Sequence, residues 1–300
     1  MVANWYKVRE CGAGHWRMEC LWWIYRIFGI RVLKFFVRII SMFIALGARG
    51  ARDASGRYKS VLNAYRKRRN LGKSNFTSYG HICAFACAVV DKMSAICDKK
   101  VKVRFDVNAD SEWCKLQKIL SGGGGAFFIC SHLGNIEALC AIPNASDKKM
   151  HAFMNVGQNP VFRGFIKRHA HYNNTVIHAT KDIDVAMAGE MYDALARGEL
   201  VMMAGDRISP NAPGKVIKSK CLGAWCVLPA GVFRFARACG APVFAIANMN
   251  TGGEEYRVFV KKLCCDNIEK MASEYMDFLE KLILKYPKQW FNFFDFFESH

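Results

Sequence analysis

Several common signatures are missing from this 300-residue sequence, and each absence narrows what the chain can be. No two cysteines have the Cys-x2-Cys spacing of a structural zinc site, so we expect no metal. The glycine run at 122–125 lacks the Lys-Ser/Thr of a phosphate-binding loop and therefore predicts a turn. Neither an internal repeat nor a long linker is present, which favours one main domain.

The sequence also lacks the cysteine pattern of a small secreted protein. Its 13 cysteines are scattered through apolar segments, as at Cys83, Cys87 and Cys130. There is no signal-peptide pattern either. We therefore expect reduced thiols in a protein that faces the cytosol.

Acidic residues are scarce in the first quarter of the chain. Residues 1–70 hold 15 Lys and Arg but only 3 Asp and Glu, so they carry +12 of the total formal charge of +18. A basic region of this kind attracts either nucleic acid or an anionic membrane surface. The residues between the charges favour a membrane surface over nucleic acid as the partner.

From Leu21 to Leu46 the chain is rich in Trp, Ile, Phe and Leu. On a helix Arg31, Lys34 and Arg38 fall within about 60° of one another and leave a broad apolar face, which predicts a helix in the membrane interface with its basic residues at the headgroups. A membrane-spanning helix is one alternative, although its charges would be costly at the bilayer centre. A helix docked on the protein's own core is another. We expect residues 1–50 to form this basic amphipathic segment and residues 51–300 the catalytic domain.

Strands and helices are expected to alternate through the rest of the chain. After helices over 54–70 and 75–98, hydrophobic periodicity predicts strands near 126–131, 149–155, 174–179, 199–205, 242–249 and 256–262. Helices are expected near 110–120, 135–141, 160–170, 182–197, 229–239 and 266–285. This order predicts an α/β fold, a mixed sheet flanked by helices, preceded by the amphipathic or membrane-anchoring helix.

A histidine follows the most apolar strand of this pattern. His132 stands on the loop after that strand, and Glu137 lies five residues further on, in the first turns of the next helix. There Glu137 could accept the imidazole Nδ1–H and leave Nε2 to take a proton from an alcohol. The pair predicts a general base without a serine nucleophile.

These residues resemble the His-x4-Asp/Glu signature of the lysophospholipid and lipid A acyltransferase superfamily. Further similar blocks follow in order: Asn159-Pro160 with Arg168, Ala204-Gly205-Asp206-Arg207, and Tyr286-Pro287-Lys288-Gln289-Trp290. The resemblance implies transfer of a fatty acyl chain from an acyl-carrier protein or coenzyme A thioester to a lipid or glycolipid hydroxyl, with no other cofactor. It implies the cytoplasmic face of a bacterial inner membrane, with the anionic membrane surface as a partner. It implies catalytic His132 and Glu137, and substrate contacts at Gly134, Asn135, Asn159, Arg168, Asp206 and Arg207.

The individual substrate contacts remain open at this point. Arg207 could grip a phosphate through two hydrogen bonds, or form a surface ion pair with Asp206. Arg168 could be a second anion contact or a helix cap, and Asn159 could hold the turn before Pro160. Gly134 and Asn135 could supply donors to an oxyanion.

Two other classes of function compete with acyl transfer. A basic RNA-binding protein would interleave aromatic residues with Lys and Arg in a recognisable module, and none is present, so we expect no nucleic-acid partner. A thioesterase or an inactive lipid-binding protein on the same fold is the second alternative. Where the family commonly ends in a basic stretch, this chain has Phe291-Asn292-Phe293-Phe294-Asp295-Phe296-Phe297. This departure leaves the acceptor open between lipid A and another envelope lipid.

Overall fold

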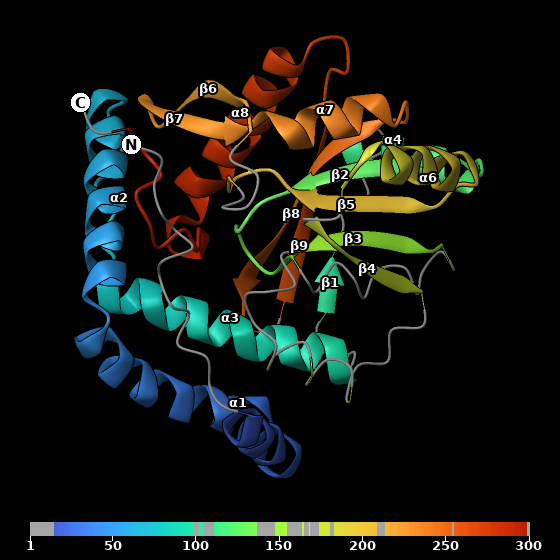
Figure 1. The fold of residues 1–300 in the computed structure, drawn as a ribbon. Coiled ribbons are helices and arrows are strands. Elements are labelled where there is room, and N and C mark those ends of the chain that lie inside the picture. The colour runs from blue at the N-terminus through green and yellow to red at the C-terminus, as the bar shows by residue number, and fades with distance from the viewer. Residues whose placement is uncertain are drawn as a thin grey trace.

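A seven-stranded mixed sheet forms the centre of the molecule (Figure 1). The structure is a computed structural model that describes residues 15–98, 102–104, 111–136, 148–154, 164, 168, 174–180, 183–208, 214–253 and 255–298. The strand order is β1-β9-β8-β2-β5-β3-β4. The strands are β1 (Lys102–Arg104), β2 (Ala126–Cys130), β3 (Met150–Met154), β4 (Thr175–Ala179), β5 (Leu200–Ala204), β8 (Val243–Gly252) and β9 (Glu255–Lys262).

The strands from β8 to β4 are parallel to one another, whereas β9 is antiparallel to β8 and carries β1 beside it. Six of these strands match the predicted ranges, and the prediction of a mixed sheet flanked by helices is confirmed. The sequence did not indicate the short β1 or the separate antiparallel hairpin of β6 (Val216–Cys221) and β7 (Ala224–Pro229).

Strand β2 shows why helices must pack on both faces of the sheet. All five of its residues are buried. Phe127 and Ile129 pack on one face with α7 (Ala230–Ala238) and α8 (Ile268–Lys285), and α6 (Val185–Ala196) contributes to the same core. Ala126 and Phe128 pack on the other face with α4 (Glu112–Ser121). Alternating side chains of a central strand thus enter two cores, which explains its unbroken apolar sequence.

Side-chain caps fix where several helices begin. The Ser111 hydroxyl accepts from the Cys114 N–H at the start of α4. Asp184 caps α6, and Asn267 caps α8 through two backbone N–H groups. Each cap satisfies a donor that the helix itself cannot.

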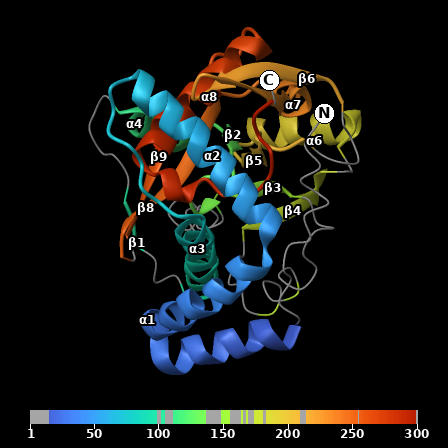
Figure 2. The same cartoon turned by 90° about the vertical axis from the view of Figure 1, so that its left-hand side faces the viewer.

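Three N-terminal helices form one side of the molecule, and the second of them reaches the β6–β7 hairpin, where the Arg68 side chain donates to the Leu222 carbonyl at 3.3 Å (Figures 1 and 2). They are α1 (His15–Gly47), α2 (Arg49–Arg68) and α3 (Ser78–Asp98). α1 consists of two helical segments that meet at Gly29, where φ is +79°. In the part of the chain that the structure describes, no helix is long and apolar enough to cross a membrane.

The second half of α1 has a narrow inner stripe and a broad outer surface. Leu33, Val37 and Ala45 are buried at intervals of four or eight residues. The outer surface is apolar, and its exposed side chains include Val32, Phe35, Phe36, Ile39, Ile40, Met42, Phe43 and Leu46. Lys34 differs from the prediction, because its ammonium turns inward and pairs with the buried Asp91 of α3 at 2.5 Å. The ion pair holds α1 on α3 with the phenylalanines facing outward.

Candidate active site

The register of two neighbouring strands brings His132 and Asp206 together. Strands β2 and β5 are parallel, and Cys130 pairs with Ala204 at their carboxyl ends. Each functional residue then lies two positions beyond the end of its strand. Ligands of parallel sheets gather at this edge, where the sequence also placed both residues.

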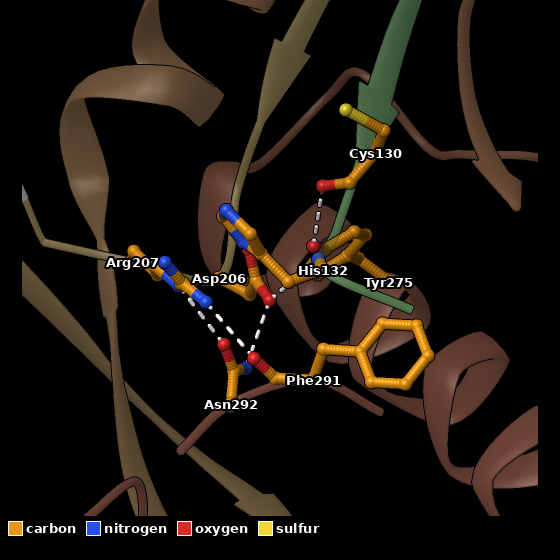
Figure 3. Close-up of polar contacts among 7 residues, drawn as sticks. All are labelled: Cys130, His132, Asp206, Arg207, Tyr275, Phe291 and Asn292. Atoms are coloured by element: carbon orange, nitrogen blue, oxygen red, sulfur yellow. Dashed lines mark hydrogen bonds and ion pairs between the residues drawn. The ribbon is translucent and has the colours of Figure 1, made fainter. Parts of the chain in front are cut away.

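The two side chains form a hydrogen-bonded pair (Figure 3). The Nδ1 atom of His132 is 2.9 Å from Oδ1 of Asp206, and the backbone N–H of His132 donates to Oδ2 at 2.9 Å. The Asp206 side chain is fully buried, whereas the imidazole is 37% exposed. One carboxylate therefore holds both the backbone and the ring of the histidine, and the ring edge that carries Nε2 points away from it.

Electrostatics keep Asp206 ionised. Burial raises the pKa of this carboxyl, but the charge and hydrogen bonds of His132 and the nearby Arg207 guanidinium outweigh burial and hold the pKa at about 2. An ionised carboxylate only accepts, so the Nδ1–H of His132 must donate to it. In the neutral imidazole Nε2 is then the unprotonated nitrogen, as a general base requires.

The loop after His132 is fixed by main-chain bonds. The N–H of Gly134 donates to the Gln289 carbonyl at 2.8 Å, and the N–H of Asn135 donates to the Asn248 carbonyl at 2.8 Å. Gly134 has φ +74°, and a Cβ there would lie 2.2 Å from the Asn248 carbonyl oxygen, so only glycine fits. Both backbone N–H groups are thus engaged in holding the loop.

The C-terminal segment completes the surroundings of the pair. The N–H of Phe291 donates to the His132 carbonyl at 2.7 Å, and the Asn292 amide donates to Oδ2 of Asp206 at 2.9 Å. Arg207 donates through Nε to Asn292 and through a terminal nitrogen to the Phe291 carbonyl, each at 3.0 Å. Arg207 therefore contacts the C-terminal segment and is not simply a surface partner of Asp206.

Two further residues of this region escaped the sequence reasoning. The Tyr275 hydroxyl donates to the Cys130 carbonyl at 2.8 Å and so ties α8 to the end of β2 (Figure 3). His81 of α3 is fully buried, with Nε2 2.8 Å from the Trp290 carbonyl and Nδ1 3.0 Å from the Ser55 hydroxyl. Both side chains contact backbone carbonyls that are far away along the chain, and no local sequence pattern predicts such contacts. Asn292 offered one signal, a polar residue inside an aromatic run.

The remaining predicted site residues fall into two groups. Glu137 and Asn159 lie outside the described residues, so their predicted roles stay predictions. Arg168 is exposed and donates through Nε and a terminal nitrogen to one Glu19 oxygen of α1, at 3.1 and 2.7 Å. Within the described ranges, no three His, Cys, Asp or Glu side chains are grouped to hold a metal ion.

A cavity of about 640 Å³ is connected to the pair through one residue, Asn292. It lies between α2 and the C-terminal segment, and its lining includes Tyr58, Trp290, Asn292 and Phe296. Cavities that hold small molecules commonly measure about 300–1,000 Å³. Asn292 also donates to Asp206, and it is the residue shared by the cavity lining and the surroundings of the pair.

A histidine–carboxylate pair at the carboxyl edge of an α/β sheet is an arrangement suited to general-base catalysis. Comparison with known families makes the assignment more specific. Residues 7–298 match the family described as bacterial lipid A biosynthesis acyltransferase, and the chain belongs to this family of acyltransferases. Among curated proteins, none matches the sequence.

Proposed function

We propose that the protein transfers a fatty acyl chain from a thioester, carried by an acyl-carrier protein or coenzyme A, to a hydroxyl of a lipid or glycolipid. The observation that carries this proposal is the His132–Asp206 pair, with its ring nitrogens distinguished by the 2.9 Å bond at Nδ1. Membership of an acyltransferase family supports the reaction class. The acceptor can be lipid A or another envelope lipid, because both classes offer the hydroxyl group that the reaction requires.

In the proposed step Nε2 of His132 removes the proton of the acceptor hydroxyl as its oxygen attacks the thioester carbonyl. The new C–O bond gives a tetrahedral oxyanion, whose collapse breaks the C–S bond. The leaving thiolate takes the proton back from the imidazolium, so ester and free thiol are the products. Asp206 fixes the tautomer and stabilises the imidazolium, as a carboxylate does beside a catalytic histidine. Glu137, if it approaches the same ring, would add to that stabilisation.

The cavity beside Asn292 supports a substrate with an apolar part. Its lining combines aromatic residues, including Trp290, Phe294 and Phe297, with charged residues of α2 such as Arg57. An acyl chain would remove apolar surface from water there at roughly 25 cal/mol per Å². Asn292, which lines the cavity and donates to Asp206, links this site to the pair.

Purified protein tests this function directly. Lauroyl-coenzyme A and a bacterial lipid extract serve as donor and acceptor, and free thiol, acylated lipid and free fatty acid are quantified. We expect acylated lipid, and His132→Ala and Asp206→Asn should each lower its formation by about 10²–10⁴-fold while both variants remain folded. Free fatty acid as the sole product would instead favour a thioesterase, and normal transfer by His132→Ala would refute the mechanism.

We also propose that α1 places the enzyme on an anionic membrane, at the cytoplasmic face of a bacterial inner membrane. The exposed phenylalanines of its outer surface support this, because soluble monomers rarely expose large contiguous apolar patches. A Phe35→Ser/Phe36→Ser/Phe43→Ser variant should lose most of its sedimentation with phosphatidylglycerol vesicles, even at low salt. The matched control is Phe85→Ser on α3, a side chain that is also exposed. Equal sedimentation of the variant and the wild-type protein would contradict the proposal.

A further inference from the structure

Asn292 is placed to control the catalytic carboxylate. Its side chain is 3% exposed, and its Nδ2 lies 2.9 Å from Oδ2 of Asp206. The same Oδ2 accepts from the His132 N–H, while Oδ1 faces the imidazole. Three donors thus surround the Asp206 carboxylate. Two belong to His132, and the third belongs to Asn292, which lies 86 positions after Asp206 in the chain.

Its neighbours fix the orientation of the Asn292 amide. Arg207 donates through Nε to Oδ1 of Asn292 at 3.0 Å, and a guanidinium has no acceptor. Asp206, which is ionised, has no donor. The amide oxygen must therefore face Arg207 and the amide nitrogen must face Asp206. If the amide were flipped, its N–H groups would face the N–H groups of Arg207, and its oxygen would face the carboxylate of Asp206.

The orienting guanidinium is itself held in place. It donates to the Phe291 carbonyl at 3.0 Å, and its carbon lies 5.6 Å from the centre of the Phe294 ring. Phe291 in turn donates to the His132 carbonyl. A closed circuit of hydrogen bonds therefore runs through His132, Asp206, Asn292, Arg207 and Phe291 (Figure 3).

We propose that Asn292 is a positioning residue that acts on His132 through Asp206. This inference rests on the proposed function of the pair. Asn292 supplies a neutral donor that fixes the plane of the carboxylate, and with it the direction of Nε2. A second carboxylate at this position would suit Arg207 but would repel Asp206, so asparagine satisfies both neighbours where aspartate cannot.

Substitutions at position 292 separate this role from simple packing. Asn292→Ala should lower kcat by about 10–100-fold with little change in KM, which is the size expected for one hydrogen bond to a charged group. Asn292→Asp has nearly the same shape and should lose more. It should also move the acidic limb of the pH profile of kcat/KM to higher pH, because the imidazole would then face two carboxylates, the introduced one and that of Asp206, against Arg207 alone. A merely structural role would leave that limb in place.

The experiment compares four full-length proteins: wild type, Asn292→Ala, Asn292→Asp and Asp193→Asn. Asp193 is the control because it is an exposed acidic residue of α6 that lines neither the cavity nor the His132–Asp206 pair. Thiol release from lauroyl-coenzyme A with lipid extract gives the rates, and thermal unfolding verifies the fold. The ¹H resonance of the His132 Nδ1–H reports the Asp206 bond without substrate, and it should shift in both Asn292 variants and stay unchanged in Asp193→Asn.

The outcomes of the two proposals can be distinguished. If His132→Ala abolishes turnover while both Asn292 variants keep the wild-type rate, pH profile and Nδ1–H resonance, the positioning role is wrong and the proposed function stands. If the wild-type protein shows no transfer, the proposed function fails on these substrates, and the Nδ1–H resonance alone decides: unchanged in both Asn292 variants, it overturns the positioning role.

Discussion

Acid should weaken the protein through His81, and the size of the effect follows from its surroundings. His81 is fully buried among Tyr58, Phe76 and Phe293. Burial lowers the pKa of His81 from 6.5 to about 4, even though the bond to the Trp290 carbonyl acts in the opposite direction. At neutral pH the ring is therefore uncharged, with Nε2–H donating to that carbonyl and Nδ1 accepting from Ser55.

The sign of the effect follows from which state binds the proton first. Between pH 6.5 and about 4 the unfolded chain is protonated at this histidine and the folded chain is not, so acid favours unfolding. One pKa unit corresponds to about 1.4 kcal/mol, which gives a loss of about 3 kcal/mol across this window. Above pH 6.5 the uncharged His81 makes its full contribution to the free energy of unfolding. Below about pH 4 the ring is protonated in both states, and the free energy of unfolding falls no further through this residue.

Urea unfolding of the full-length protein, followed by tryptophan fluorescence between pH 4 and pH 7, measures this loss. The variant His81→Gln keeps an amide donor near Nε2 and cannot titrate. We expect its free energy of unfolding to be about 1 kcal/mol lower at pH 7, because the Ser55 bond is lost, but to fall about 3 kcal/mol less on acidification. Other groups, such as His178, titrate in both proteins and cancel in the difference. Parallel curves for the two proteins would refute the reasoning.

Two further predictions concern the loop and the N-terminal helix. Gly134→Ala should destabilise the protein by about 1–3 kcal/mol from backbone strain alone and abolish acyl transfer. Gly189→Ala, in open space on α6, should be neutral or slightly stabilising, and thermal unfolding compares the two. Lys34→Met should cost about 3–5 kcal/mol because Asp91 keeps its buried charge without Lys34, and the double variant with Asp91→Leu should recover much of this loss. A Lys34→Met protein as stable as wild type would show that the pair does not hold α1 on α3.

Hydrophobic periodicity sufficed for the main elements of the fold. Strands β2, β5 and β8 were predictable because they are buried on both faces and read as continuous apolar runs. Strand β6 alternates exposed lysines with buried residues, and the turn between β6 and β7 has positive φ at Leu222 as well as at Gly223. Leucine is uncommon in this conformation, so the turn carries no recognisable sequence signal.

The amphipathic pattern of α1 was correct in kind but not in detail. Helical periodicity grouped Lys34 with Arg31 and Arg38 as an outward basic face. The prediction was wrong for Lys34 because its partner Asp91 lies on α3, 57 residues away. Periodicity describes one helix at a time, whereas the direction that a charged side chain such as Lys34 takes also depends on the charges of the element that the helix packs against.

The same limit explains why the sequence did not indicate Asp206 as a hydrogen-bond partner of His132. Glu137 is near His132 along the chain, and local spacing favoured it as the acceptor of the Nδ1 proton. Asp206 is 74 residues away, yet the register of two parallel strands brings it beside the ring, and its backbone bond to His132 can form only there. Parallel strands joined by long connections regularly create such neighbours, because residues at equal distances beyond paired strand ends meet at one edge of the sheet. A carboxylate at the same offset after the adjacent strand is therefore well placed to bond a histidine that follows a buried strand, and Asp206 stands at that offset.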